Sequence, residues 1–498
     1  MAFLLKKYRE SPLVHLKNRF FKKHRNHTNK LFKNIFFLKI IFIYFATNQV
    51  IFKKTSNKTQ KQEETMYWNK KVECMGREEM RRLQSERLVK MVEHVYNDST
   101  YYRKRMDECG VKPQDIRSID DISKLPFTTK QDLRDNYPFG LFCVPMQEIV
   151  RLHASSGTTG KPIVAGYTKG DLEMWSEVVA RSMMAAGVSK NDVMQVSYGY
   201  GLFTGGLGAH DGGTLLGASI VPTGSGNTEK QITLMHDFGS TVLACTPSYA
   251  LYIADAIKKS GYDIEDFKLR VGIFGAEPWT DAMRREIEEK LKLKAYDIYG
   301  LTEMCGPGVG CECHCQNGTH LWEDHFYPEI IDPETLEPLP PGEKGELVFT
   351  NLTKWGMPMI RYRTRDLTTL HYETCECGRT AVRMSKILGR SDDMLIIRGV
   401  NVFPSTIESI ILEFPECEPY YMIEVDRVNN TDTFDIQIEV HPEYYTDRIT
   451  ELASLKKRIT ARVQSVVGIS PNIKIVEPNT IERSMGKAKH AIDRRKFE

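Results

Sequence analysis

Short apolar runs rich in β-branched residues alternate with amphipathic stretches through the middle of the chain. Runs typical of strands occur at 193–197, 219–221, 241–245, 271–274 and 296–299, and helical stretches occur at 171–186, 248–259 and 280–291. Consecutive strands that are joined through a helix run in the same direction, which favours a parallel sheet. We therefore predict an α/β fold in which mostly parallel sheets are covered by helices.

The pattern changes on both sides of this alternating region. A charged helical stretch over 77–97 and a second one ending near Gly110 precede it, and strands with turn signals follow Glu329. Beyond about residue 391 the pattern is a compact α+β one, with strands at 420–425, 434–440 and 473–476 and a helix at 447–467. Because 498 residues are too many for one ordinary core, we predict a large N-terminal domain at 66–390 that includes a β-rich subdomain, and a small mobile C-terminal domain at 391–498.

The first 65 residues differ in composition from the rest. They carry fifteen lysine or arginine residues and three acidic residues, so the remaining residues account for about −9 within the overall +3. A mildly acidic body argues against nucleic acid as a partner. The apolar run 35–45 contains Lys39 and is shorter than the roughly 20 residues that span a bilayer, so no stable membrane insertion is expected. We expect a disordered or spurious extension before a natural start at Met66; a weak membrane anchor is the alternative.

Eleven cysteines are spread along the chain without a secretory signal, which favours reduced thiols and a cytoplasmic protein. Five of them form two tight groups: Cys311, Cys313 and Cys315, then Cys375 and Cys377. Soft thiolates drawn from two segments suit a tetrahedral structural Zn²⁺. The preferred ligands are Cys313, His320, Cys375 and Cys377, with Cys315 in place of His320 as the second choice. Reduced cysteines without a metal are the other interpretation.

A loop rich in hydroxyl groups and glycine carries the strongest local signal. It reads Ser155, Ser156, Gly157, Thr158, Thr159, Gly160, Lys161 and Pro162. Its glycines permit a tight loop whose backbone N–H groups can face an anion, and Lys161 adds a positive charge. The loop differs from the P-loop of nucleotide hydrolases, which has four residues between its glycines and a Ser or Thr after its lysine. Taken alone, such a loop is more often a solvated turn.

Together with four later motifs, this loop resembles the adenylate-forming superfamily of acyl-CoA ligases, luciferases and adenylation domains. The later motifs are Tyr299-Gly300-Leu301-Thr302-Glu303, Arg361–Asp366, Gly389–Asp393 with Ile397-Arg398-Gly399, and Ser484–Lys487. They occur in the order found in that superfamily across residues 66–498. Such an order is highly specific.

Within the superfamily the chain most resembles the phenylacetate–CoA ligases, on the segments 198–210, 275–279, 322–326 and 393–404. It departs from them at Asp211-Gly212-Gly213, at Met304-Cys305 and at His490. The first departure adjoins the segment expected to bind the substrate. It leaves open which aryl acid is used.

The resemblance implies an enzyme that uses ATP to join an aryl acid, phenylacetate or a relative, to coenzyme A through an acyl-adenylate. Residues Ser155–Lys161 would hold the β- and γ-phosphates, and Glu303 would bind Mg²⁺ beside Thr302. Lys487 would reach the carboxylate and α-phosphate oxygens. Adenylation brings two anions together, so its catalysis depends on neutralising charge and positioning the reactants.

The same resemblance assigns residues to adenosine, to the acid and to the hinge. Tyr299 would face adenine near Ala276 and Glu277, while Asp366 would accept both ribose hydroxyls and Arg390 would contact the ribose. The acid would lie among Tyr198, Tyr200, Phe203 and Gly205, and Asp392 would be the hinge about which the small domain rotates. A homodimer is one expected assembly. Two alternatives remain open: an adenylating enzyme that transfers AMP or acyl to an acceptor other than coenzyme A, and a non-catalytic zinc-bearing scaffold.

Overall fold

The chain divides into two compact units, Met1–Thr65 and Met66–Glu498. The computed structural model describes residues 67–155, 162–387, 389, 395–398, 400–428, 431–445, 449–483 and 490–495. The predicted extension over residues 1–65 therefore lies outside the described residues.

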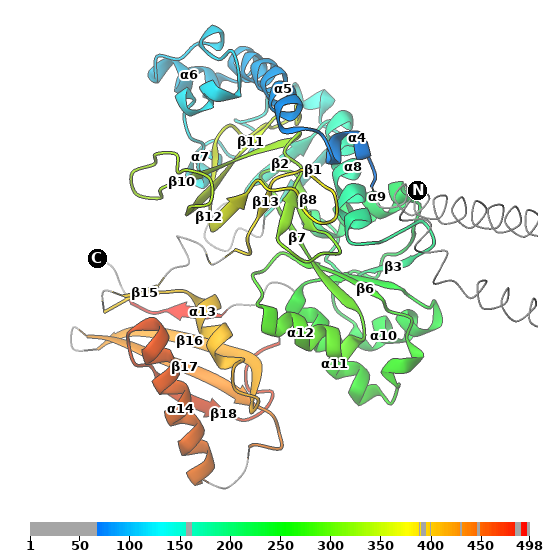
Figure 1. The fold of residues 1–498 in the computed structure, drawn as a ribbon, viewed down its shortest axis with the longest axis vertical. Helices are drawn as coiled ribbons and strands as arrows, with labels where there is room; N and C mark the ends of the chain where they lie inside the picture. The colour runs from blue at the N-terminus through cyan, green and yellow to red at the C-terminus, as the bar shows by residue number, and fades with distance from the viewer. Residues whose placement is uncertain are drawn as a thin grey trace, which may run out of the picture. The chain divides into compact units, whose positions relative to one another are not determined.

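Helices alternate with strands as the sequence pattern predicts (Figure 1). The helices are α4 (Lys70–Glu73), α5 (Arg77–Asp98), α6 (Thr100–Glu108), η1 (Pro113–Asp115), η2 (Ile119–Lys124), α7 (Lys130–Asp135), η3 (Met146–Glu148), α8 (Lys169–Ala185), α9 (Thr204–Leu216), α10 (Thr228–Asp237), α11 (Pro247–Ser260), η4 (Ile264–Asp266), α12 (Asp281–Leu291), α13 (Pro404–Ile411) and α14 (Ile449–Val467). The three helices expected in the alternating region are confirmed as α8, α11 and α12, each within two residues of the predicted ends.

Within the described residues, the strands form one large sheet and three small ones. They are β1 (Arg151–Ala154), β2 (Val164–Tyr167), β3 (Val193–Val196), β4 (Ser219–Val221), β5 (Val242–Cys245), β6 (Val271–Gly275), β7 (Lys294–Leu301), β8 (Gly306–Glu312), β9 (Thr319–Leu321), β10 (Phe326–Ile331), β11 (Lys344–Asn351), β12 (Tyr362–His371), β13 (Arg383–Met384), β14 (Leu395–Ile397), β15 (Val400–Val402), β16 (Cys417–Val428), β17 (Thr431–Val440), β18 (Asn472–Val476) and β19 (Ala491–Asp493).

The large sheet has eleven strands in the order β10-β11-β12-β13-β9-β8-β7-β6-β5-β3-β4. Strands β3 to β7 pair in parallel, as predicted, and the remaining pairs are antiparallel. The β-rich segment that begins near Glu329 thus continues the same sheet. The direction changes where β7 turns back into β8, because a short hairpin can join antiparallel strands only.

Helix packing explains the glycines at the first departure from the ligase pattern. A Cβ at Gly208 would lie 2.6 Å from the Trp175 ring, and one at Gly212 would lie 2.4 Å from Val179. These glycines are four residues apart and therefore share one face of α9, against which α8 packs closely. Asp211, between them, accepts a 2.6 Å hydrogen bond from Arg151. The Asp211-Gly212-Gly213 segment therefore joins α9 to α8 and to β1.

Residues beyond 394 contain a core of their own. A four-stranded sheet in the order β18-β17-β16-β19 packs with α13 and α14 around buried residues that include Ile423, Ile436 and Ile459. His490 stacks on Tyr421 with a centroid distance of 4.6 Å. Burial lowers the pKa of His490 to about 4, so this departure from the family pattern is a neutral, half-buried residue.

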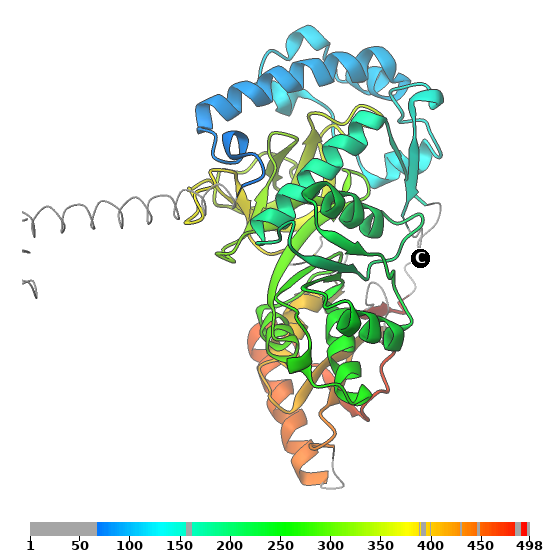
Figure 2. The same ribbon diagram turned by 90° about the vertical axis from the view of Figure 1, so that its right-hand side faces the viewer.

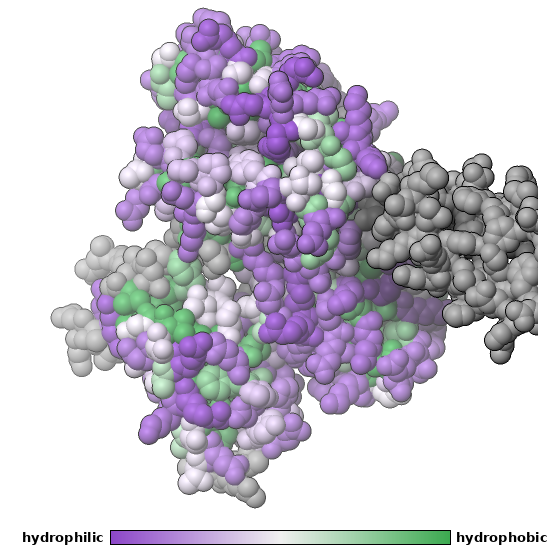
Figure 3. All heavy atoms as spheres, viewed as in Figure 1, coloured by the Kyte–Doolittle hydropathy of each residue, from purple (hydrophilic) through white to green (hydrophobic). Residues whose placement is uncertain are grey.

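Two views summarise the described surface and its elements. The face drawn in Figure 3 is mainly hydrophilic, with hydrophobic residues in small patches, because the apolar side chains fill the buried cores. Figure 2 shows the long helix α5 beside α6. Within the described part of the chain, no helix combines the length and apolar character that a bilayer crossing needs.

Candidate active site

The loop expected to hold phosphate connects the two strands of a hairpin, β1 and β2. Ser155 closes its base: its N–H donates to the Ile163 carbonyl at 2.9 Å, and its hydroxyl accepts from the Ile163 N–H at 3.0 Å. Antiparallel pairing of Ala154 with Val164 continues the hairpin away from the loop. Residues 156–161, predicted to contact phosphate, lie outside the described residues. The described part is therefore a two-stranded hairpin closed by Ser155 and Ile163.

The turn that follows β7 carries Thr302 and Glu303. A Cβ at Gly300 would meet the Gly306 carbonyl oxygen at 1.9 Å, so glycine is needed for this tight reversal into β8. Tyr167, at the end of β2, donates from its hydroxyl to the Cys305 carbonyl at 3.1 Å. This bond joins the turn to the hairpin that bears the phosphate loop. The structure thus brings together two of the predicted motifs.

Lys354 lies beneath this turn and is fully buried. Its Nζ donates to the Glu303 carbonyl at 3.3 Å and lies 4.7 Å from the centroid of the Tyr167 ring. Burial lowers the pKa of Lys354 to about 8, against the opposing fields of Asp171, Cys305 and Glu303. The Glu303 carboxylate is itself mostly buried, and no described residue donates a hydrogen bond to it. Lys354 therefore holds the main chain of Glu303 and leaves its carboxylate available.

Tyr299 and Asp366, from β7 and β12, meet directly. The Tyr299 hydroxyl donates to Asp366 Oδ2 at 2.6 Å, and both residues are half-buried. Arginines neighbouring Asp366 have other carboxylate partners: Arg361 bonds Glu329, while Arg363 bonds Glu346. Arg361 and Arg363 are therefore held by carboxylates other than that of Asp366. The structure brings together the two residues predicted to bind adenosine.

Ala276 and Glu277 follow β6, next to β7. A Cβ at Gly275 would lie 2.2 Å from the Ile298 carbonyl oxygen, so glycine lets the two strands approach. Ala276 is exposed with a φ of +74°, and such strained backbone is concentrated at functional sites. Glu277 is buried, and its Oε1 accepts from the Ser248 N–H at 2.7 Å. One carboxylate oxygen of Glu277 thus caps the first turn of α11.

The segment between β3 and α9, together with the first turn of α9, contains the residues predicted to bind the acid. Tyr198 packs against the main core, and a Cβ at Gly205 would lie 3.5 Å from its ring. Tyr200 is half-buried, and its hydroxyl lies 3.3 Å from His210 Nδ1. Phe203 is 51% exposed at the start of α9. Two tyrosines thus line the interior side of this segment, while Phe203 faces outward in this conformation.

Main-chain bonds connect the acid segment to the other motifs. The Leu202 carbonyl accepts from the Ala154 N–H at 2.9 Å, and His153 Nδ1 lies 3.0 Å from the same oxygen. These contacts tie the segment to the base of the phosphate hairpin. Arg390, Asp392 and Lys487 lie outside the described residues. Just before the lysine motif, Arg483 bonds the buried Glu439 in a bidentate pair, which anchors the chain there.

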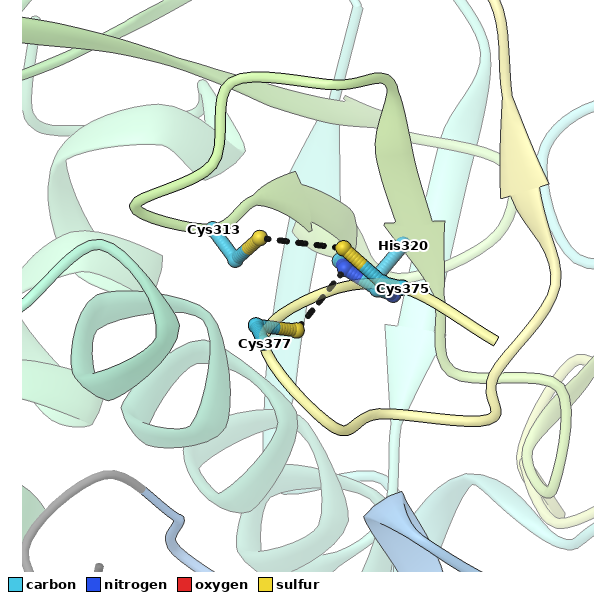
Figure 4. A group of neighbouring side chains, drawn as sticks. All are labelled: Cys313, His320, Cys375 and Cys377. Carbon is cyan, nitrogen blue, oxygen red and sulfur yellow. Dashed lines mark hydrogen bonds between the residues drawn. The ribbon is translucent and has the colours of Figure 1, made fainter. Parts of the chain in front are cut away.

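The cysteine prediction corresponds to a real cluster (Figure 4). Ligand atoms of Cys313, His320, Cys375 and Cys377 all lie within 4.8 Å of one another, and the four residues are buried. Cys315 is half-buried and belongs to a second group with Cys313 and His314. The structure therefore favours the first choice of ligands over the one with Cys315.

Comparison with known proteins agrees with this geometry. The sequence profile described as AMP-binding enzyme matches residues 82–353, and the AMP-binding enzyme C-terminal domain matches 399–495. Phenylacetate–coenzyme A ligases are close relatives: that of Thermus thermophilus is 48% identical over 86% of this chain and all of that enzyme. The Escherichia coli K12 enzyme is 50% identical over 85% of this chain and 97% of its own. The chain belongs to the phenylacetate–coenzyme A ligase family of AMP-binding enzymes.

The fold of this AMP-binding enzyme matches solved relatives. A 2-hydroxyisobutyryl-CoA ligase in its postadenylation state has a TM-score of 0.82 at 28% identity, covering 86% of this chain and 92% of that one. The same ligase in its thioesterification state has a TM-score of 0.65. The family that the five motifs indicate is thus confirmed, and so is its fold.

Sequence reasoning missed two residues of this AMP-binding enzyme's site. Lys354 gave no signal because a single lysine in a loop is usually solvated. Gln231, in α10, was also missed; its buried amide bonds the carbonyls of Gly224 and Gly226, and its Oε1 accepts from Ser197 at 2.6 Å. Gln231 thereby fixes the end of β3, where the acid segment begins. Both roles depend on contacts between distant segments.

Proposed function

We propose that this enzyme joins phenylacetate, or a closely similar aryl acid, to coenzyme A through an acyl-adenylate, with release of AMP and pyrophosphate. The observation that carries the proposal is about half identity to phenylacetate–coenzyme A ligases of four bacteria over most of the chain. Contacts among the phosphate hairpin, the Glu303 turn and the Tyr299–Asp366 pair support it. ATP and coenzyme A are its co-substrates.

Each group of residues has a task in adenylation. A carboxylate oxygen of the acid attacks the α-phosphorus of ATP, and pyrophosphate leaves. Residues of the loop 155–161 would hold the departing phosphates with backbone N–H groups, and Lys487 would neutralise the carboxylate and α-phosphate oxygens. Asp366 would accept hydrogen bonds from the ribose hydroxyls, in exchange for its bond from Tyr299. The Tyr299 ring would then lie against adenine, next to Ala276.

A magnesium ion fits the Glu303 turn. Mg²⁺ prefers hard carboxylate oxygens and bridges phosphates. Glu303 offers a carboxylate with no hydrogen-bond donor among the described residues, next to the Thr302 hydroxyl, on a turn whose main chain Lys354 holds. When bound, the ion would neutralise charge on the phosphates. The proposed metals are this Mg²⁺ and a structural Zn²⁺ at the cysteine cluster.

The second step requires access for a thiol, so the C-terminal residues that carry Lys487 would rotate about Asp392 after adenylation. A related ligase has been solved in a postadenylation and a thioesterification state, and this chain resembles the first more closely, with TM-scores of 0.82 and 0.65. The small domain would thus take part first in adenylation and then in thioester formation.

A panel of aryl and aliphatic acids tests the proposal. Pyrophosphate release and thioester formation are measured in parallel, with and without coenzyme A. Phenylacetate or a close aryl relative should give the highest kcat/KM, and thioester should equal pyrophosphate when coenzyme A is present. Pyrophosphate release without any thioester would instead support an adenylating enzyme with another acceptor. Absence of both with every acid would support the non-catalytic scaffold.

A further inference from the structure

The four clustered side chains have the spacing of a tetrahedral metal site. Ligand distances of about 2.3 Å for Zn–S and about 2.05 Å for Zn–N in a tetrahedron imply S–S separations of about 3.8 Å and S–N separations of about 3.5 Å. The Cys313 and Cys375 sulfurs lie 3.8 Å apart, and Cys377 Sγ lies 3.5 Å from His320 Nε2 (Figure 4). A disulfide would need sulfurs about 2.05 Å apart. These two separations therefore match zinc ligation, and all four ligand atoms lie within 4.8 Å of one another.

The buried histidine also calls for a stronger partner. His320 Nδ1 is buried, and it has no hydrogen-bond partner among the described residues. Its Nε2 has the 3.5 Å contact with the Cys377 sulfur. Buried polar atoms nearly always have a good partner, because an unsatisfied one costs free energy. Zinc at Nε2 would replace this weak contact with a bond, while Nδ1 would keep the ring proton and stay without a partner among the described residues.

A buried ion pair lies beside the cluster. Arg379 is fully buried and hydrogen-bonds the Cys377 side chain, while its Nε donates to Glu73 at 2.7 Å. Three thiolates with Zn²⁺ carry a net charge of −1, and the Arg379 guanidinium, held in place by its ion pair with Glu73, lies beside them. Polar groups around the ligands commonly fix and tune such sites. Here Arg379 and Glu73 would be the polar groups that hold the ligands in place.

The cluster lies where the large sheet is narrowest. β13 is two residues long, and it pairs with β12 through two residues and with β9 through the same two. Other neighbouring strands of the sheet, within the described residues, pair through three or more. His320 lies in β9 and Cys313 follows β8, whereas Cys375 and Cys377 lie between β12 and β13. The four side chains therefore connect both sides of this junction.

The two sides of the junction carry the two adenosine residues. Tyr299 lies on β7 opposite Gly310 of β8, and Cys313 comes directly after β8. Glu312 reinforces the link, because its Oε2 accepts from the Asp297 N–H at 2.8 Å. Asp366 lies on β12, which ends four residues before Cys375. Any shift at the junction would change how Tyr299 and Asp366 face each other.

We propose that Cys313, His320, Cys375 and Cys377 bind one Zn²⁺ that fastens the two halves of the large sheet and so sets the geometry of ATP binding. The site is structural, because all four ligand positions come from the protein and are buried. The Zn²⁺ ion crosslinks the short β13 connection. The proposal is independent of which acid the enzyme uses.

Metal analysis of the purified full chain is the first test. About one Zn²⁺ per chain is expected, falling below one tenth in Cys377→Ser and unchanged in the control Cys109→Ser, whose thiol is exposed. Full-length protein without bound metal, after purification with zinc in the buffers, would overturn the site. So would a Cys313–Cys375 disulfide found by peptide mapping.

A second test uses the unmodified enzyme, in case the serine variants do not fold. Zinc is removed with a chelator and restored as zinc sulfate alone, while ATP binding is followed by calorimetry without any acid present. Removal should weaken ATP binding about tenfold and speed amide exchange in β9, β13 and β12, with β16 and β17 unchanged; zinc should reverse both effects. Unchanged ATP affinity after complete zinc loss would overturn the proposed role in ATP binding. Failure of ligation with every acid would leave these measurements unaffected.

Discussion

The Tyr299–Asp366 pair and the cysteine cluster are connected through the same strands, yet their polar atoms are satisfied in opposite ways. The pair is half-buried, and its 2.6 Å hydrogen bond can be exchanged for bonds to a ligand. The cluster is buried and closed by its own four ligands. Variants of the nucleotide site should therefore change rates and affinities with little effect on stability. Variants of the cluster should change stability first.

Lys487 gives the largest expected effect on the nucleotide side of this comparison. In Lys487→Ala, pyrophosphate release should fall on the order of 10²–10³-fold, because a charge that contacts the transition state is lost. The thioester step from supplied acyl-adenylate should be nearly unchanged, and so should the Tm. The control is Lys489→Ala, two residues away. Equal loss in both half-reactions would contradict the assigned role.

Asp392→Pro should show the opposite division between the two steps. Proline fixes its own φ and restricts the preceding residue, so it should hinder rotation of the small domain. Adenylation should survive while thioester formation falls by about tenfold or more, as lid and domain motions often limit turnover. Asp392→Ala, which lacks the ring, serves as the control. If the Pro variant slows both steps alike, the rotation does not occur at this residue.

The variant Asp366→Asn tests whether the Tyr299–Asp366 pair affects ATP binding more than stability. Hydrogen bonds to a charged group contribute about 1.5–3 kcal/mol, so ATP binding should weaken by about ten- to hundredfold. The Tm should change little, because the Tyr299 hydroxyl can still donate to the amide oxygen. Calorimetry with ATP and a thermal melt measure both quantities. A large loss of Tm with normal ATP affinity would show that Asp366 stabilises the fold and does not bind ATP.

Lys354 is buried like the cysteine cluster but contacts the nucleotide site, so it tests the comparison between the two regions. Its folded pKa of about 8 lies below the ordinary 10.5, so the folded state releases the proton first as pH rises. Wild-type stability should therefore rise relative to Lys354→Met between about pH 8 and 10.5, and the difference should be constant below pH 8. Thermal melts of both proteins across this range measure it, with the exposed Lys258→Met as control. A difference that does not depend on pH would refute the buried, shifted amine.

The smallest effect is expected from removing residues 1–65. Their composition differs from that of the rest, and Met66 begins the compact unit Met66–Glu498. A chain starting at Met66 should have the kcat/KM and Tm of the full chain within error. Loss of protein yield or activity would show that the extension contributes.

Local patterns explain why so much of the fold was predictable. The runs that became β3 to β7 are apolar because parallel strands are buried on both faces, so they are recognised as continuous apolar runs without tertiary information. The cluster was predictable because a metal requires particular side chains at short spacing, and Cys375 and Cys377 satisfy that requirement locally. In both cases nearby residues carry the signal.

Contacts between distant segments could not be read in the same way. Lys354 belongs to the site because it contacts the Glu303 carbonyl and the Tyr167 ring, which come from distant segments of the chain. The continuation of the β-rich segment into the parallel sheet depends on β13, two residues that carry no strand pattern. Tertiary packing decides such features, and sequence spacing does not record it.

The segment before α5 has a consequence for synthesis on the ribosome. The Tyr67 hydroxyl donates to the Cys377 carbonyl, and Arg379 bonds Glu73; these partners are 310 and 306 residues apart. At about 5–20 residues per second, the first member of each pair waits roughly 15–60 s for the second. During that time α5 can pack on α6, η1 and η2, which follow it directly, whereas Tyr67 and Glu73 lack their partners. Early folding must therefore proceed around the helices and parallel strands, and the two ends of the large domain join last.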